Sequence, residues 1–170
     1  KDNTFDAIVS NQVFEHVSDV KIMISEIARV LKTNGVFIIL FPTKEIIIEP
    51  HLKLALIHRI IQYPMVLKVY LHIAFILKLG SSKKTTLSRK SWVKDRVEYL
   101  HNDVNYTSYS EFIRLLHEYQ FSFSDYTLDH FKEKFQRKWL IKFFDLTLGI
   151  KHLGGVCLTG QLTNSKNIPR

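Results

Sequence analysis

Two short apolar runs that flank one amphipathic segment constrain the fold more than any other feature of the sequence. The runs are Phe5–Ser10 (FDAIVS) and Val36–Phe41 (VFIILF), and neither alternates between apolar and polar residues. Such runs are typical of parallel strands covered on both faces. Between them, apolar residues recur at helical spacing, at Ile24, Ile27, Ala28 and Leu31. The order strand, helix, strand predicts a βαβ unit with a right-handed crossover.

The ends of this helix can be placed from residue types. Ser18 or Asp19 can cap its first turn, Lys32 falls in its last turn, and Gly35 is placed to end it. A second helix is predicted near residues 106–121, where Ser108 and Glu111 have the spacing of a capping box. Its apolar face is Phe112, Leu115, Leu116 and Tyr119.

The other segments are assigned by composition and periodicity. Residues 46–79 are long, apolar and interrupted by two prolines, which predicts two helices, and the polar residues 80–90 predict an exposed loop, the best candidate for mobility in the chain. Residues 121–128 alternate like a strand, residues 131–148 read as a basic, aromatic helix, and residues 155–162 predict a last strand. The chain is therefore expected to be α/β.

Composition limits the class of protein. One cysteine, Cys157, excludes an intrachain disulfide and a cysteine-based zinc cluster, and no run of eighteen uncharged apolar residues occurs. We expect a cytoplasmic protein, with membrane-peripheral contact as an option. Residues 46–90 hold eight Lys or Arg against one acid, Glu49, so they carry +7 of the total charge of +8. This asymmetry predicts an anionic partner for that segment.

Four stretches of the sequence together resemble the second half of class I S-adenosylmethionine-dependent methyltransferases. They are the strand FDAIVSNQVFEHV (residues 5–17), the capped helix ending EIARVLKTNG (26–35), the strand VFIILFPT (36–43) and the helix YTSYSEFIRLLHEYQF (106–121). The resemblance implies a Rossmann-like, mostly parallel sheet ordered 3-2-1-4-5-7-6, of which this chain supplies strands four to seven. Residues 1–170 would then be a partial methyltransferase domain, and residues 46–100 a helical, basic insert that caps the site. None of the six glycines forms the G-x-G-x-x-G cradle. We therefore expect a fragment that begins inside the domain and, by itself, is inactive.

The same resemblance implies S-adenosylmethionine as cofactor. In a doubly wound sheet, ligands bind beyond the carboxyl ends of strands, which explains the polar residues after the first apolar run. Asn11 would lie against the methionine part of the cofactor, with Ser10 and Gln12 beside it. Glu15 and His16 follow on the same rim, and His16 could take a proton from the acceptor. The alternative is that Glu15 and His16 only begin the helix and pack.

The insert occupies the place where the family commonly binds its acceptor, which we expect to be a small molecule or a glycan- or lipid-linked group. Pro42, Glu49, His51 and Tyr106 are the candidate acceptor-binding residues. The alternative for His51, next to a proline, is that it only opens a helix. The eight histidines show no metal-ligand spacing, so no metal is expected.

A second hypothesis comes from another class of function. The basic insert could be part of a non-catalytic module that binds an anionic membrane surface or a polyanion, with Lys53, Arg59, Lys68 and Lys78 reaching toward head groups. Nucleic acid ranks lower, because no recognition module is visible.

Overall fold

The structure is a computed structural model, and it describes residues 1–127 and 156–163. Eleven helices and strands lie in these ranges, together with the 3-10 turns η1 (Phe14–His16) and η2 (Gly80–Lys84). The elements are β1 (Phe5–Asn11), α1 (Val20–Val30), β2 (Leu31–Phe41), β3 (Ile48–Glu49), β4 (Leu54–Ala55), α2 (Ile57–Ile60), α3 (Pro64–Ile76), α4 (Arg89–Asn102), α5 (Tyr109–Glu118), β5 (Phe121–Asp125) and β6 (Val156–Leu162). The predicted helix over residues 131–148 lies outside the described residues.

The main sheet has the strand order β1-β2-β6-β5. Strands β1 and β2 are parallel, whereas β6 is antiparallel to both β2 and β5. This order is the 4-5-7-6 half of the expected sheet, so the predicted α/β fold is confirmed. A parallel pair joined through α1 is a βαβ unit, and it brings the carboxyl ends of β1 and β2 to the same edge.

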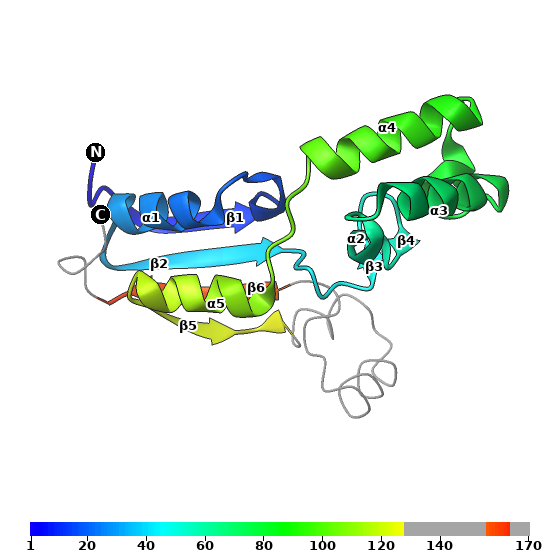
Figure 1. Cartoon of the computed structure of the whole chain (residues 1–170). Helices are drawn as coiled ribbons and strands as arrows, with labels where there is room; N and C mark the ends of the chain where they lie inside the picture. Colours follow the sequence, from blue (N-terminus) through cyan, green and yellow to red (C-terminus); the bar gives the residue numbers. More distant parts are fainter. Residues whose placement is uncertain (128–155, 164–170) are drawn as a thin grey trace.

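Helices α1 and α5 cover one face of this sheet (Figure 1). They bury alternate residues of β2, including Phe37, Ile39 and Phe41, in what we call the sheet core. On the opposite face Val36 and Ile38 remain 39% and 43% exposed. Burial of β1 and β2 on both faces was therefore a wrong expectation for this chain.

Helix α1 starts where the sequence indicated and ends earlier. The Asp19 side chain accepts a hydrogen bond from the backbone N–H of Ile22 (3.1 Å), so Asp19 is the cap. The helix stops at Val30, because Leu31 is extended and fully buried at the start of β2. Lys32 and Gly35 therefore belong to the strand, and their prediction as helix end was wrong.

The first half of the basic insert is not helical. Residues 48–55 form the two-stranded hairpin β3–β4, and only the short α2 follows before α3. Lys53 and Leu56 take the left-handed conformation (φ 55° and 56°), and the buried carboxylate of Glu49 accepts a hydrogen bond from the backbone N–H of Leu52. These contacts stabilise a turn, so the predicted helix that His51 would open is wrong.

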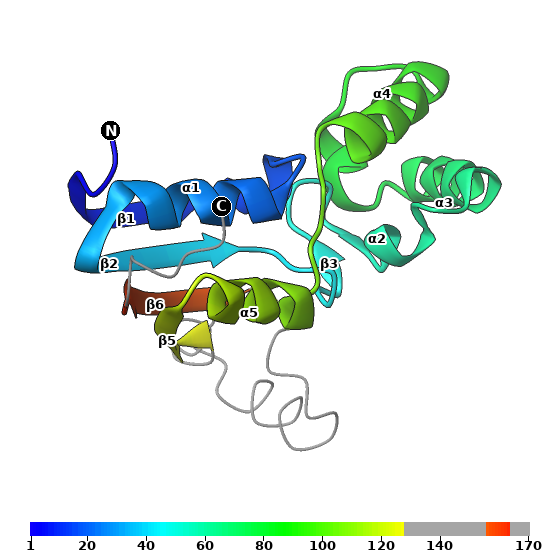
Figure 2. The same cartoon turned by 60° about the vertical axis from the view of Figure 1, so that its left-hand side comes forward.

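Helices α2, α3 and α4 lie beside the sheet (Figure 2), and a second group of buried side chains, which we call the insert core, holds this region together. It consists of Leu52, Leu54, Ile57, Leu67, Leu71, Ala74, Trp92, Val93, Leu100, Val104 and Tyr106. Helices α3 and α4 pack together here, with the rings of Phe75 and Trp92 5.6 Å apart.

The segment 80–90 is more ordered than a simple exposed loop. Ser82 is buried and donates hydrogen bonds to the carbonyls of Ala74 (3.1 Å) and Leu79 (2.5 Å), and Ser88 caps α4. The predicted loop is thus wrong for these positions. By contrast, the Ser108 cap of α5 and its buried face are confirmed. No helix in the described part of the chain has the length and apolar character needed to cross a membrane.

Candidate functional site

The candidate site begins where β1 ends. Gln12 takes the left-handed conformation (φ 56°), and its backbone N–H donates to the carbonyl of Leu40 in β2 (2.8 Å). The turn η1 follows, with Phe14 buried against the rings of Phe41 (5.3 Å) and Phe112 (5.2 Å). Phe14 anchors η1 on the sheet core and thereby fixes the two residues that follow it.

Glu15 is the first of these residues, and its side chain is completely buried (0% exposed). Neither carboxylate oxygen accepts a hydrogen bond from another residue in the described ranges. Burial raises the pKa of Glu15 above its usual value, and the nearby His16 and His51 oppose that shift. Buried polar atoms in folded proteins are nearly always partnered, so an unpartnered carboxylate indicates a place for a ligand.

The imidazole of His16 is held by the end of the insert. Its Nδ1 lies 2.6 Å from the backbone carbonyl oxygen of Asp103, and the backbone N–H of Asn105 donates to the carbonyl of Glu15 (2.6 Å). A carbonyl oxygen only accepts, so His16 Nδ1 must carry the proton. In the neutral ring, Nε2 of His16 is left with a free lone pair.

His51 is held in the same manner from the hairpin. Its Nδ1 lies 2.8 Å from Oε1 of Glu49, a completely buried carboxylate. The same oxygen accepts a hydrogen bond from the hydroxyl of Tyr106 (2.7 Å), and Oε2 accepts from the backbone N–H of Leu52. Burial and the carboxylate of Glu49 raise the pKa of Tyr106, which keeps its hydroxyl a donor.

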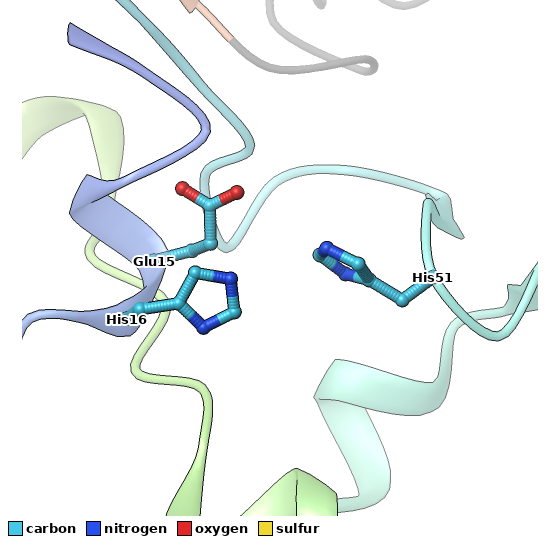
Figure 3. A group of neighbouring side chains, drawn as sticks. All are labelled: Glu15, His16 and His51. Atoms are coloured by element: carbon cyan, nitrogen blue, oxygen red, sulfur yellow. The ribbon is translucent and has the colours of Figure 1, made fainter.

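Glu15, His16 and His51 converge at the junction of the sheet core and the insert core (Figure 3). One possible ligand atom from each lies within 4.8 Å of the others, and the two imidazole rings are 5.6 Å apart. The rings extend toward one another from η1 and from the β3–β4 turn. We call these three residues the Glu-His-His cluster. Its two histidines are exposed, so the cluster is open to solvent on one side.

Other buried polar groups near the same edge of the sheet also lack partners among the described residues. They are the Oγ of Ser10 at the end of β1, Oγ1 of Thr43 just after β2, and the hydroxyl of Tyr99 on α4. The ring of Tyr99 lies 5.8 Å from that of His51, and burial together with Glu49 and Glu15 raises the pKa of Tyr99 to about 12. A concentration of unsatisfied groups at one edge is typical of a binding site.

The structure brings together five of the residues singled out in the sequence: Glu15, His16, Glu49, His51 and Tyr106. Asn11 and Gln12 lie exposed at the end of β1, and Pro42 is buried just after β2. Sequence reasoning missed three contributors, namely Tyr99, the carbonyl of Asp103 and Asn105, whose side-chain amide donates to the carbonyls of Val17 and Ser18. No local pattern marks them, because they act only through contacts made by folding.

Comparison with known proteins matches the first part of the chain to a family model. Residues 1–39 match the family model of a methyltransferase domain, and this range contains β1, η1 and α1 with both Glu15 and His16. The family match covers residues 1–39 of the 170 residues, so the similarity to a methyltransferase domain concerns the first part of the chain. The glycine-rich G-x-G-x-x-G cradle has no counterpart in the sequence of this chain.

Among solved structures, the chain is similar to the YcgJ protein from Bacillus subtilis, at 17% identity and a TM-score of 0.45, over 96% of this chain and 66% of that one. It is also similar to PKMT2 from Rickettsia typhi, at 16% identity and a TM-score of 0.46, over 98% of this chain and 36% of that one. The chain thus spans less than two thirds of either structure. No curated protein sequence matches it.

Proposed function

We propose that this chain is the carboxy-terminal half of an S-adenosylmethionine-dependent methyltransferase whose acceptor binds at the Glu-His-His cluster. The observation that carries the proposal is the position of Glu15 and His16. Both follow β1 directly, inside the range matched by the methyltransferase family, at the edge of the sheet where doubly wound folds bind ligands.

The cofactor side of the site would be the end of β1. Ser10 is buried there with an unpartnered hydroxyl, and Asn11 and Gln12 are exposed beside it. We propose these three residues as contacts of the methionine part of S-adenosylmethionine. The remainder of the cofactor would be bound by residues outside this chain, since the sequence has no glycine-rich cradle.

The acceptor side would be the face that the insert adds. Glu49 contacts His51 and Tyr106 there, Pro42 is buried just after β2, and the eight basic residues at positions 46–90 are all exposed. A polar site on a basic insert suits an acceptor that carries both hydroxyl groups and an anionic part. A small molecule and a glycan- or lipid-linked group both fit this description.

Methyl transfer from a sulfonium is an in-line displacement, so most of the catalysis comes from holding the acceptor atom and the methyl group close and aligned. The Glu-His-His cluster offers three groups that accept hydrogen bonds and no donor once Nδ1 of each histidine is engaged. Such a set binds the O–H or N–H of an acceptor and draws its proton away during attack. His16, on the turn η1 that follows β1, is the residue we assign to receive it.

Titration of S-adenosylmethionine into the full-length protein tests the proposal by calorimetry and by the shift of the thermal midpoint. We expect saturable binding, because a ligand that binds only the folded state raises the midpoint. Asn11→Ala should weaken binding about tenfold, the size of one lost hydrogen bond. Asn102→Ala, at the exposed end of α4, is the matched control and should leave binding unchanged.

Two results would count against the proposal. The absence of any binding by the full-length protein would remove the cofactor assignment, and equal losses in Asn11→Ala and Asn102→Ala would remove the site. Residues 1–170 alone should bind S-adenosylmethionine weakly or not at all, so a low-micromolar dissociation constant for them would contradict the proposed division of the cofactor site.

A second candidate function, contact with an anionic membrane surface, is favoured by one surface of α3. Six apolar residues cover about a third of the circumference of that helix and its end, and all are exposed: Met65, Val66, Val69, Ile73, Ile76 and Leu77. Lys68 and Lys78 lie near this surface and are exposed as well. An apolar stripe with neighbouring lysines suits an interface with anionic lipid, which would bring a lipid-linked acceptor to the site.

Co-sedimentation with vesicles tests this second candidate. The full-length protein should bind phosphatidylglycerol-containing vesicles, and it should bind less at high salt and less to pure phosphatidylcholine. Val69→Glu on the stripe should reduce binding, whereas Ile22→Glu, at a similarly exposed apolar residue of α1, should not. Equal binding to charged and uncharged vesicles would exclude membrane contact through α3. An equal loss of vesicle binding in Val69→Glu and Ile22→Glu would exclude it as well.

A further inference from the structure

We infer that the Glu-His-His cluster is a binding site for one divalent transition-metal ion of the zinc type, with Glu15, His16 and His51 as its ligands. This inference deepens the proposed function, since it concerns the same site. In the metal-bound form the free lone pair of His16 is engaged, so the ion, in place of His16, would promote loss of the acceptor's proton. The metal test below nevertheless needs neither cofactor nor acceptor. His16 and His51 lie far apart in the sequence, so the site exists only in the folded chain.

The first argument is that each residue presents a lone pair and none presents a proton. Nδ1 of His16 donates to the carbonyl of Asp103, and Nδ1 of His51 donates to the carboxylate of Glu49. In the neutral ring, each histidine is then left with an unprotonated Nε2, which is the form that binds metal. The carboxylate of Glu15 has no partner on another described residue. Three converging acceptors without a donor require either a proton or a cation between them.

The second argument is the outer layer of contacts. Metal-binding histidines usually donate their other N–H to a carboxylate or a backbone carbonyl, which fixes the ring and raises its basicity. His51 has the carboxylate form of this contact through Glu49, and His16 has the carbonyl form through Asp103. Glu49 is in turn held by Tyr106 and Leu52. The supporting contacts are thus complete before any ion binds.

The third argument is charge. Glu15 and Glu49 place two completely buried carboxylates at this junction, close enough to influence each other, although the chain as a whole carries +8. A buried carboxylate without a cation or a donor is costly. The buried carboxylate of Glu15, which has no donor among the described residues, therefore favours a cation here.

The fourth argument is geometry. Two histidines and one carboxylate are a ligand set that leaves positions open on a catalytic metal. Ligand atoms about 2.0–2.1 Å from a tetrahedral zinc ion lie about 3.4 Å from each other. One possible ligand atom of each residue lies within 4.8 Å of the others, so side-chain rotations that move these atoms by an ångström or so, roughly the difference from 3.4 Å, would bring them to zinc-binding distance. The open side faces solvent past the two exposed imidazoles, where an oxygen of the acceptor can coordinate.

Metal titration of the full-length protein tests the inference directly. After dialysis against a chelator, Zn²⁺ is titrated by calorimetry, and Co²⁺ is added in parallel to follow its visible absorption. We expect one site per chain. His16→Ala and His51→Ala should each weaken binding by at least tenfold, and Glu49→Gln, which leaves all three ligands in place, by about 10–100-fold. His101→Ala, an exposed histidine at the end of α4, is the control and should bind as the unchanged protein does.

Circular dichroism of the metal-free variants shows whether they fold, and His51 is exposed enough to be replaced without unfolding the chain. The absence of stoichiometric Zn²⁺ binding by the unchanged protein would overturn the inference. So would equal affinities for His16→Ala, His51→Ala and His101→Ala. Zinc binding without S-adenosylmethionine binding would support the metal site and contradict the methyltransferase proposal. S-adenosylmethionine binding without zinc binding would contradict the metal site and support the methyltransferase proposal.

Discussion

The sheet core and the insert core are built by different means, and the candidate site lies where they meet. Strands that are far apart in sequence pair in the sheet core, and two helices on one face seal it. The insert core depends on helix packing between α3 and α4 above a two-stranded hairpin. Glu15 and His16 come from the first and His51 from the second. The chemistry of the site therefore depends on how firmly the two cores are held against each other.

The largest expected effect comes from removing one large aromatic side chain from each core. Phe112 is completely buried against Phe14 and Phe41, and Trp92 is 2% exposed against Phe75. Phe112→Ala and Trp92→Ala should each lower the free energy of unfolding by about 3–5 kcal/mol, because both leave a cavity. Urea denaturation of the full-length protein measures this loss.

Hydrogen exchange then shows whether the two cores unfold together. We expect Phe112→Ala to reduce protection in both cores, because the sheet core anchors η1, and Trp92→Ala to reduce it mainly in α3 and α4. Equal loss of protection in β2 for both variants would show that the two cores unfold as one cooperative unit, and the distinction between the sheet core and the insert core would then fail.

The two regions also differ in how much of them the sequence predicted. In the sheet region, the βαβ unit, the Asp19 cap and the Ser108 cap follow from patterns a few residues long, and all three are present. In the insert, the first predicted helix is a hairpin, because a buried carboxylate at Glu49 and left-handed residues decide that turn. Those causes depend on tertiary contacts, which periodicity does not report.

The same division applies to the candidate site. Glu15 and His16 could be singled out because they follow a buried strand, where doubly wound sheets bind ligands. That His51 lies beside them could not be predicted, because it requires the hairpin to pack against η1. The carbonyl of Asp103 is out of reach for any sequence pattern, since every residue has a carbonyl.

A smaller effect is expected from the hydroxyl groups that hold the junction. Tyr106 donates to the buried carboxylate of Glu49 (2.7 Å), so Tyr106→Phe should lower the free energy of unfolding by about 1.5–3 kcal/mol, as for a hydrogen bond to a charged group. Tyr70 donates to the carbonyl of Ala55 (2.8 Å) within the insert, and Tyr70→Phe should cost only about 0.5–1.5 kcal/mol.

The pair also separates stability from function. Tyr106→Phe should weaken Zn²⁺ binding, because Glu49 then holds His51 less firmly, whereas Tyr70→Phe should not alter it. If the two variants lose equal stability and equal metal affinity, the junction has no special role, and the insert acts as one body with the sheet.

The smallest effects are expected at the two helix caps, one in each region. Asp19 accepts a hydrogen bond from the N–H of Ile22 in α1 (3.1 Å), and Ser88 accepts one from the N–H of Ser91 in α4 (3.2 Å). Asp19→Ala and Ser88→Ala should each lower the free energy of unfolding by about 1 kcal/mol, since each leaves one N–H at a helix end without its partner. Urea denaturation measures both.

Because α1 packs in the sheet core and α4 in the insert core, Asp19→Ala should reduce the hydrogen-exchange protection of β2 while Ser88→Ala leaves it unchanged. If instead Ser88→Ala reduced the protection of β2 and Asp19→Ala did not, the stability of the sheet core would depend on the insert core, which is the reverse of what we expect.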